Sequence, residues 1–254
     1  MITDPRFYVF ALPIVFLVGL SKGGFLPGIG VLGVPLLSLL VSPTVAAGIL
    51  LPVLIVMDWV GVWSFRKTFD LVHLKAFLPG ALVGTGIGWA TAAYVTDAQI
   101  QIIVGVIGLA FMAYNLFLRA WAMPTVPPGP RMGAVLGTTA GFTSFISHAG
   151  GPLMQIYLQP QKLPPALFAG TTIMCFAAIN AIKFVPFLSL GLINARSIGT
   201  DLALLPMAVI AALCGVWLAK RVPQEPFYAV ANVCLAVVSA ELIREGVVTM
   251  VGRG

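Results

Sequence analysis

Residues 21–37 read SKGGFLPGIGVLGVPLL, and apolar sequence flanks this stretch on both sides. Five glycines and two prolines fall within the thirteen positions from Gly23 to Pro35. In a helix interior, glycine costs about 1 kcal/mol relative to alanine and proline costs about 3 kcal/mol. A continuous helix tolerates that density poorly, so we expect a helix that breaks inside an apolar segment.

The rest of the chain is also strongly apolar. Of its 254 residues, 59% are hydrophobic and only 9% are charged, and the mean hydropathy is +1.04. A soluble domain carries about 25% charged residues, whereas a stretch of about 20 apolar residues is long enough to cross a bilayer. The composition therefore predicts an all-α fold, a polytopic membrane helix bundle surrounded by the lipid bilayer.

Apolar windows divide the chain into about eight membrane elements, of which the first and fifth are interrupted. A Pro-rich linker at residues 121–130 separates a first membrane repeat, residues 1–120, from a second, residues 131–254. The eight predicted elements cover residues 7–41, 44–63, 75–94, 98–118, 131–158, 164–187, 200–220 and 226–246.

Short matches between the two halves indicate an internal duplication. The stretch 78–81 (LPGA) aligns with 205–208 (LPMA), and Asp58 aligns with Asn180. Isolated Gly and Pro residues also match by chance, but ordered agreement through four elements favours duplication. Repeats of this size are common in secondary transporters, whose substrate sites lie at the repeat interface.

A second interrupted stretch, SFISHAGGPL at residues 144–153, opens the second half. A broken helix exposes the amides of a half-helix N-terminus, and these attract anions. The amides of Gly23, Gly24, Gly150 and Gly151 are therefore candidate anion ligands. The alternative, which we weigh equally, is that these glycines only allow close packing of helices.

Ionisable residues lie directly at both breaks. Lys22 is within the first, and His148 precedes the glycine pair of the second. A charge at the bilayer centre costs at least about 2.5 to 3.5 kcal/mol, so such side chains normally face a cavity or a partner. The alternatives are that Lys22 extends to an interface and that His148 is a structural imidazole bonded to a carbonyl.

Asp58 lies inside an apolar helix, and Lys183 follows its repeat mate Asn180 by about one turn. Asp58 is a candidate to neutralise Lys22 or Lys183, or to carry a coupling proton; the alternative is an interfacial aspartate. Ser21 and Ser147 are hydroxyl donors near the breaks, although serine more often bonds its own helix backbone.

Basic loops predict the orientation. Arg66 and Lys67 mark the connection after the second element as cytoplasmic. In the second half, Arg196 and Arg244 favour a parallel repeat, whereas Lys220 and Arg221 favour an inverted one. We favour parallel repeats with both termini cytoplasmic.

Catalytic and cofactor motifs are missing from the sequence. It has no P-loop, Rossmann or zincin pattern, and it has two histidines and eight acidic residues in total. We therefore expect no enzyme, no cofactor and no metal site. The net charge of +6 comes from residues mostly between apolar windows, so we expect no nucleic-acid partner.

The stretches GLSKGGFLPGIGVLGVPLL at residues 19–37 and GFTSFISHAGGPLMQIYLQPQKLP at residues 141–164 resemble the TauE/SafE family of sulfite exporters, also called the TSUP permeases. The resemblance covers nearly the whole chain. It implies transport of sulfite, sulfonates or related sulfur anions across the bacterial inner membrane. The usual run of three adjacent glycines is absent from the first half. The matching motif residues are Ser21, Lys22, Gly23, Gly24, Gly33, Pro35, Ser147, His148, Gly150, Gly151 and Pro152.

The sequence thus predicts a secondary transporter, an exporter of a small sulfur-containing anion such as sulfite or an organosulfonate. Proton coupling and a homodimer are options that the sequence leaves open. The alternatives are a passive anion channel or a membrane-embedded non-transport subunit. The expected substrate-binding residues are Ser21, Lys22, Gly23, Gly24, Ser147, His148, Gly150 and Gly151, with Asp58, Asn180 and Lys183 in coupling or supporting positions.

Overall fold

A computed structural model describes residues 2, 4–25, 28–92, 94, 96–120, 127–193 and 195–251. The described chain is all-helical and contains no strand. Most of the predicted linker, residues 121–126, lies outside the described residues. Among the described residues, five helices are long and apolar enough to cross a membrane. They contain the segments Pro5–Lys22, Val45–Phe65, Leu71–Thr91, Pro165–Ser189 and Ile198–Ala219.

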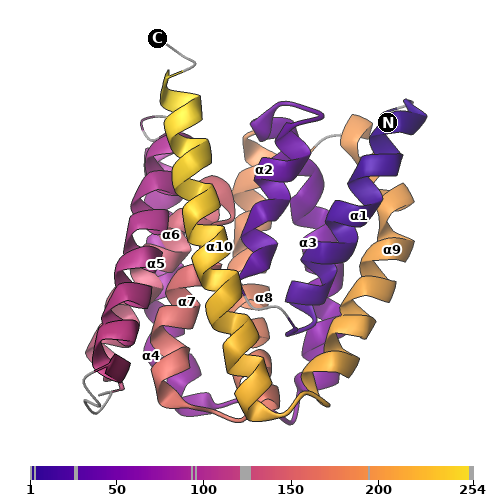
Figure 1. Ribbon diagram of the computed structural model, residues 1–254. Coiled ribbons are helices and arrows are strands. Elements are labelled where there is room, and N and C mark those ends of the chain that lie inside the picture. The colour runs from indigo at the N-terminus through magenta and orange to yellow at the C-terminus, as the bar shows by residue number, and fades with distance from the viewer. Residues whose placement is uncertain are drawn as a thin grey trace.

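The helices alternate with short turns along the chain (Figure 1). In the first half they are α1 (Pro5–Lys22), η1 (Ile29–Leu32), α2 (Gly33–Ser38), α3 (Pro43–Phe65), α4 (Leu71–Thr91) and α5 (Asp97–Ala120). In the second half they are α6 (Pro130–Ser147), α7 (Gly151–Leu158), η2 (Gln159–Gln161), α8 (Pro165–Ser189), α9 (Ala195–Ala219) and α10 (Gln224–Val251).

Both interrupted segments are hairpins that return to the end of the bundle where they began. After the break, α2 runs back along α1, so that a Cβ added to Gly33 would lie 2.8 Å from Cγ2 of Val18. In the second hairpin, Gly133 near the start of α6 packs against the ring of Tyr157 near the end of α7. His148, with a left-handed φ of 54°, closes the end of α6 and lets the chain reverse.

Corresponding helices of the two halves run in opposite directions. Gly48 of α3 packs on Leu192 beyond the end of α8, whereas Gly61, later in α3, packs on Ile173 near the start of α8. The pair α5 and α10 is antiparallel in the same way, because Gly105 contacts Ile243 while Gly246 contacts Ala98. The parallel arrangement favoured by the basic residues is therefore wrong. Each hairpin returns to its own side, so the direction of the next half depends on the helices outside the hairpins. These are α3, α4 and α5 in the first half and α8, α9 and α10 in the second, and an odd number reverses the direction.

The amino terminus and the α3–α4 turn lie at opposite ends of the bundle. The amide of Ile2 donates to Oγ1 of Thr200 at the start of α9, 2.9 Å away. The ammonium of Lys220, just after α9, donates to the carbonyl of Ser64 at the end of α3. Figure 1 places both chain termini at the same end. The prediction that the termini share the cytoplasmic side with the α3–α4 turn is therefore wrong.

Apolar packing joins each hairpin to a helix of the other half. One hydrophobic cluster is built mainly from α1, α2, α3 and α9, and a second from α4, α6, α7 and α8. Gly23 of α1 lies against Ala212 of α9, and Gly84 of α4 lies against Thr138 of α6, so closely that a Cβ on either glycine would overlap backbone. Small residues permit such close approach of membrane helices. We refer to these two sets of helices as the first and second packing groups.

Candidate functional site

A cavity lies between the two hairpins. Its volume is about 70 Å³ measured to the centres of water-sized spheres, which is room for several waters or one small anion. Polar side chains form part of the wall, namely Ser21, Lys22, Ser144, His148, Gln155, Thr172 and Asn180. The apolar part of the wall includes Leu54, Met154, Phe168, Ile173 and Phe176.

The tips of the two hairpins meet at glycines on the cavity wall. A Cβ on Gly151, the first residue of α7, would lie 3.3 Å from Cα of Gly28. Gly28 has a left-handed φ of 87°, and a Cβ there would lie 2.5 Å from Nε2 of Gln155. Glycine at these positions therefore allows the hairpins to approach without filling the space between them.

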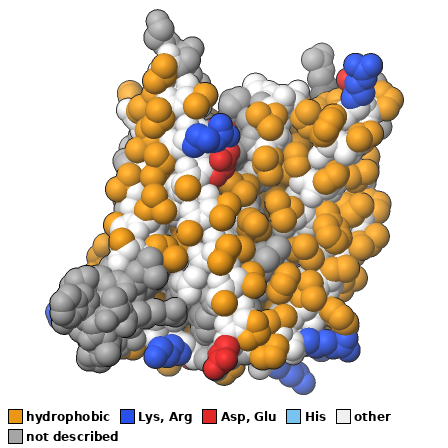
Figure 2. Space-filling view, viewed as in Figure 1, with side chains coloured by type: hydrophobic (Ala, Val, Ile, Leu, Met, Phe, Trp, Pro, Cys, Tyr) orange, Lys and Arg blue, Asp and Glu red, His pale blue; other side chains and the backbone are white. Residues whose placement is uncertain are grey.

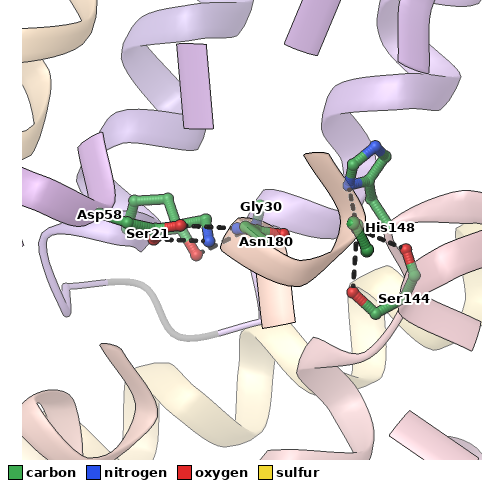
Figure 3. A network of polar contacts seen from close by, with 8 residues as sticks. Ser21, Gly30, Asp58, Ser144, His148 and Asn180 are labelled. Atoms are coloured by element: carbon green, nitrogen blue, oxygen red, sulfur yellow. Dashed lines mark hydrogen bonds and ion pairs between the residues drawn. The ribbon is translucent and has the colours of Figure 1, made fainter. Parts of the chain in front are cut away.

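Lys22 and Asp58 form a buried ion pair beside the cavity. The Lys22 Nζ is 2.8 Å from Oδ1 of Asp58, and the amide of Asn180 donates to Oδ2 at 2.6 Å (Figure 3). The Lys22 side chain is 16% exposed and that of Asp58 is 4% exposed. The ammonium also lies 5.4 Å from the ring centre of Phe176. Asp58 therefore neutralises Lys22, as one of the sequence interpretations proposed, and is not an interfacial aspartate.

Lys183 is completely buried behind His148. Its Nζ donates to the carbonyl of Ser144 at 2.7 Å and to the Ser144 hydroxyl at 3.2 Å, and it lies 3.0 Å from Nδ1 of His148. In Figure 3, Ser144 and His148 lie together on one side of the view, Asp58 and Ser21 lie on the other, and Asn180 lies between them. The two lysines thus occupy separate polar clusters.

The predicted role of Gly23 and Gly24 as amide ligands does not fit the first break. The amide of Gly23 donates to the carbonyl of Gly19 at 2.8 Å, and that of Gly24 donates to the carbonyl of Ser21 at 3.0 Å. Both amides close the C-terminal end of α1, so they are not free donors. Gly23 instead serves the contact with α9, which was the alternative reading of these glycines. Ser21 lines the cavity, and its hydroxyl accepts from the amide of Gly30 at 3.1 Å.

The second break agrees better with the predicted binding of an anion by backbone amides. Gly151 and His148 line the cavity, and Gly150 and Gly151 begin α7 without donating a hydrogen bond to any described residue. Gly150 itself packs against Ala140 and is off the cavity wall. Ser147 is also off the wall, and its buried hydroxyl turns back to the carbonyl of Thr143 at 3.5 Å, as serine often does in helices.

Ser144, Gln155, Thr172 and Phe176 are among the cavity residues that were not predicted as ligands. Gln155 is a polar side chain within an apolar stretch, which was a usable signal. Thr172 and Phe176 are four residues apart on α8 and thus share a helix face. Nothing in the local sequence indicates that this face meets the hairpins, because that contact depends on packing between distant segments.

These features define a multi-pass membrane protein with a mainly apolar cavity that lies between two helical hairpins and contains several polar side chains. The family model described as Sulfite exporter TauE/SafE matches residues 11–242, so the chain belongs to the TauE/SafE family. This confirms the resemblance seen in the sequence motifs. Members are membrane transporters of the sulfite and anion exporter type and not enzymes. Comparisons with curated proteins and with solved structures find no match.

Proposed function

We propose that the cavity binds a small sulfur-containing anion, sulfite or a small organosulfonate, and that the protein exports it. The observation that carries the proposal is the position of the cavity between a lysine ammonium and a helix N-terminus. Lys22 lines one side, and the start of α7 with His148 lines the other. Cations and free amides at a helix N-terminus both stabilise an anion, and most strongly where water is scarce.

The shape and lining of the cavity fit this class of substrate. A site of about 70 Å³ admits a compact oxyanion but leaves little room for a long chain. Met154, Phe168 and Phe176 form an apolar wall that a short organic substituent would contact, whereas the oxygens would face Lys22 and His148. The backbone amide of Gly151, which lines the cavity, would complete the ligand set.

The direction of the protein in the bacterial inner membrane follows from its basic end. Positively charged side chains concentrate at the end of the bundle that holds the α3–α4 turn, and Figure 2 shows basic residues along this end. We assign this end to the cytoplasm, which puts both termini outside. The described basic residues at this end are Arg66, Lys67, Lys75, Arg131, Lys162, Lys220 and Arg221.

Alternating access would come from rocking of the two packing groups around the cavity. The pair Lys22–Asp58 lies within the first group, and the contacts of Lys183 lie within the second. The hydrogen bond from Asn180 to Asp58 connects the groups and would be the contact remade during the cycle.

A passive channel remains the second candidate. Sulfite accumulation in liposomes against its own gradient, driven by an imposed proton gradient, would exclude that channel.

Replacement of Lys22 tests the anion site. We expect Lys22→Met to abolish sulfite flux in liposomes because the cation nearest the cavity is lost. Since this variant leaves Asp58 unpaired, Lys22→Met/Asp58→Asn provides a charge-neutral companion that should fold normally and also fail to transport. Lys162→Met, at an exposed position, is the matched control and should retain flux. Normal sulfite affinity in the double variant would remove Lys22 from the site.

A further inference from the structure

Lys22, which is partly buried, and Lys183, which is fully buried, differ in how their charge is compensated. Both oxygens of Asp58 are already engaged, one by Lys22 and one by Asn180. The ammonium of Lys183 instead contacts three polar atoms without formal negative charge, two on Ser144 and one on His148. In the part of the chain that the structure describes, no carboxylate lies within ion-pair distance of Lys183.

The geometry around Lys183 matches a protonated amine. An ammonium has three N–H donors and no acceptor, and three acceptors surround the Lys183 Nζ at 2.7, 3.2 and 3.0 Å. If His148 accepts through Nδ1, its ring is neutral and its proton is on Nε2. The Ser144 carbonyl belongs to the last turn of α6, the end of a helix that attracts a cation. The local contacts thus stabilise the charge without cancelling it.

The net charge of the site connects Lys183 to the substrate. Lys22 and Asp58 cancel each other, so protonated Lys183 leaves one positive charge in a buried site. An uncompensated buried charge is costly. A monovalent anion in the cavity would compensate it, and by thermodynamic reciprocity protonation of Lys183 must then favour anion binding as much as the anion favours protonation.

We propose that Lys183 carries the proton that couples to anion transport and that His148 conducts this proton to the cavity. The proposal rests on the anion site of the proposed function. His148 lines the cavity and Lys183 does not, so the imidazole stands between the amine and the substrate. In the structure Nε2 of His148 is buried, so the imidazole must first move to meet a cavity water. On release, Nε2–H then gives its proton to that water while a proton of Lys183 passes to Nδ1, which leaves a neutral amine and a neutral imidazole. Loading reverses these steps.

The charged neighbours support Lys183 over Asp58 as the proton carrier. Among the described residues, the ionisable groups of this site are Lys22 from α1, Asp58 from α3 and His148 from the end of α6. The helices α4 and α9 also pack on α8, but none of their described ionisable side chains forms a hydrogen bond or ion pair with Lys183. Protonation of Asp58 would leave the Lys22 ammonium without a counter-charge, whereas deprotonation of Lys183 would leave no carboxylate without one.

The test is calorimetric titration of the purified protein with methanesulfonate, a small sulfonate that stays ionised. Buffers of different ionisation enthalpy report protons taken up on binding. Wild type should take up as much as about one proton per anion, with affinity falling about tenfold per pH unit where uptake is complete. Lys183→Arg keeps a permanent cation and should bind without proton uptake or pH dependence, and Lys162→Met should behave as wild type.

Each result decides between the two proposals. Binding by wild type together with unchanged proton uptake in Lys183→Arg would overturn the role of Lys183 and leave the anion site standing. Binding without any proton uptake in wild type would do the same. No binding heat with wild type, sulfite included, would overturn the anion site and this inference with it. Lys183→Met should also bind without proton uptake, which provides a second variant if Lys183→Arg does not fold.

Discussion

A lysine ammonium lies at the end of the first helix of each hairpin, but its charge is compensated differently in the two hairpins. Lys22 is the last residue of α1 and pairs with the carboxylate of Asp58. Lys183 comes from α8, and its ammonium contacts the last turn of α6 through neutral acceptors alone. This difference in counter-charge coincides with the sequence match between Asp58 and Asn180, where the second half has an amide and the first has a carboxylate. One hairpin therefore holds a fixed charge pair and the other a charge that can vary.

The largest loss of stability is expected from removing the carboxylate of Asp58. Asp58→Ala leaves Lys22 without its partner and should lower the free energy of unfolding by about 3 kcal/mol. Lys183→Met should cost less, because it removes a charge instead of exposing one and leaves only neutral acceptors unpaired. Denaturation of both variants in detergent, followed by tryptophan fluorescence, provides the measurement.

The double variant Lys22→Met/Asp58→Ala is the control for this prediction. It should recover most of the lost stability, since neither charge then lacks a partner. A loss for Lys183→Met as large as that for Asp58→Ala would show that Lys183 also has a counter-charge. The contrast between the two hairpins would then be wrong.

The fold was predictable where the signal is local in the sequence. The density of glycine and proline from Gly23 to Pro35 indicated a break, and the described chain has α1 and α2 there in place of one continuous helix. A lysine within an apolar membrane segment needs a partner, so the sequence alone made Asp58 a candidate. The direction of the second half was not predictable, because an apolar segment that crosses the bilayer and one that turns back have the same composition.

The site was only partly predictable for a similar reason. A glycine beside a break serves either as an amide donor or as a packing position, and the choice depends on which helix lies opposite. Gly23 faces α9 and Gly150 faces Ala140, so both serve packing. Gly151 faces the tip of the other hairpin and lines the cavity. The internal duplication itself stays a prediction.

The second largest loss of stability is expected at the glycines that allow each hairpin to pack on a helix of the other half. The losses at the two positions should be similar. Gly23→Ala would force a methyl group into the backbone of α9, and Gly84→Ala would force one into the backbone of α6. Overpacking of this kind costs about 1 to 3 kcal/mol. Gly86→Ala is the matched control, since no atom lies within 4 Å of its added Cβ, and it should leave the thermal midpoint unchanged or higher. A large loss for only one of the two anchors would show that the hairpins are not held equivalently.

The smallest effect on stability, and the most specific one on binding, is expected at the tip of the first hairpin. Gly28→Ala and Gly191→Ala both put a side chain at a left-handed φ, of 87° and 69°, and each should cost about 1 kcal/mol of stability. Only at Gly28 does the new methyl group also meet a neighbour, Nε2 of Gln155 on the cavity wall, whereas the space around Gly191 is open. Sulfite affinity, measured by calorimetry, should therefore fall in Gly28→Ala and stay at the wild-type value in Gly191→Ala. Equal affinity in both variants would mean that the contact between the hairpin tips does not shape the substrate site, and the cavity would then owe its form to the packing groups alone.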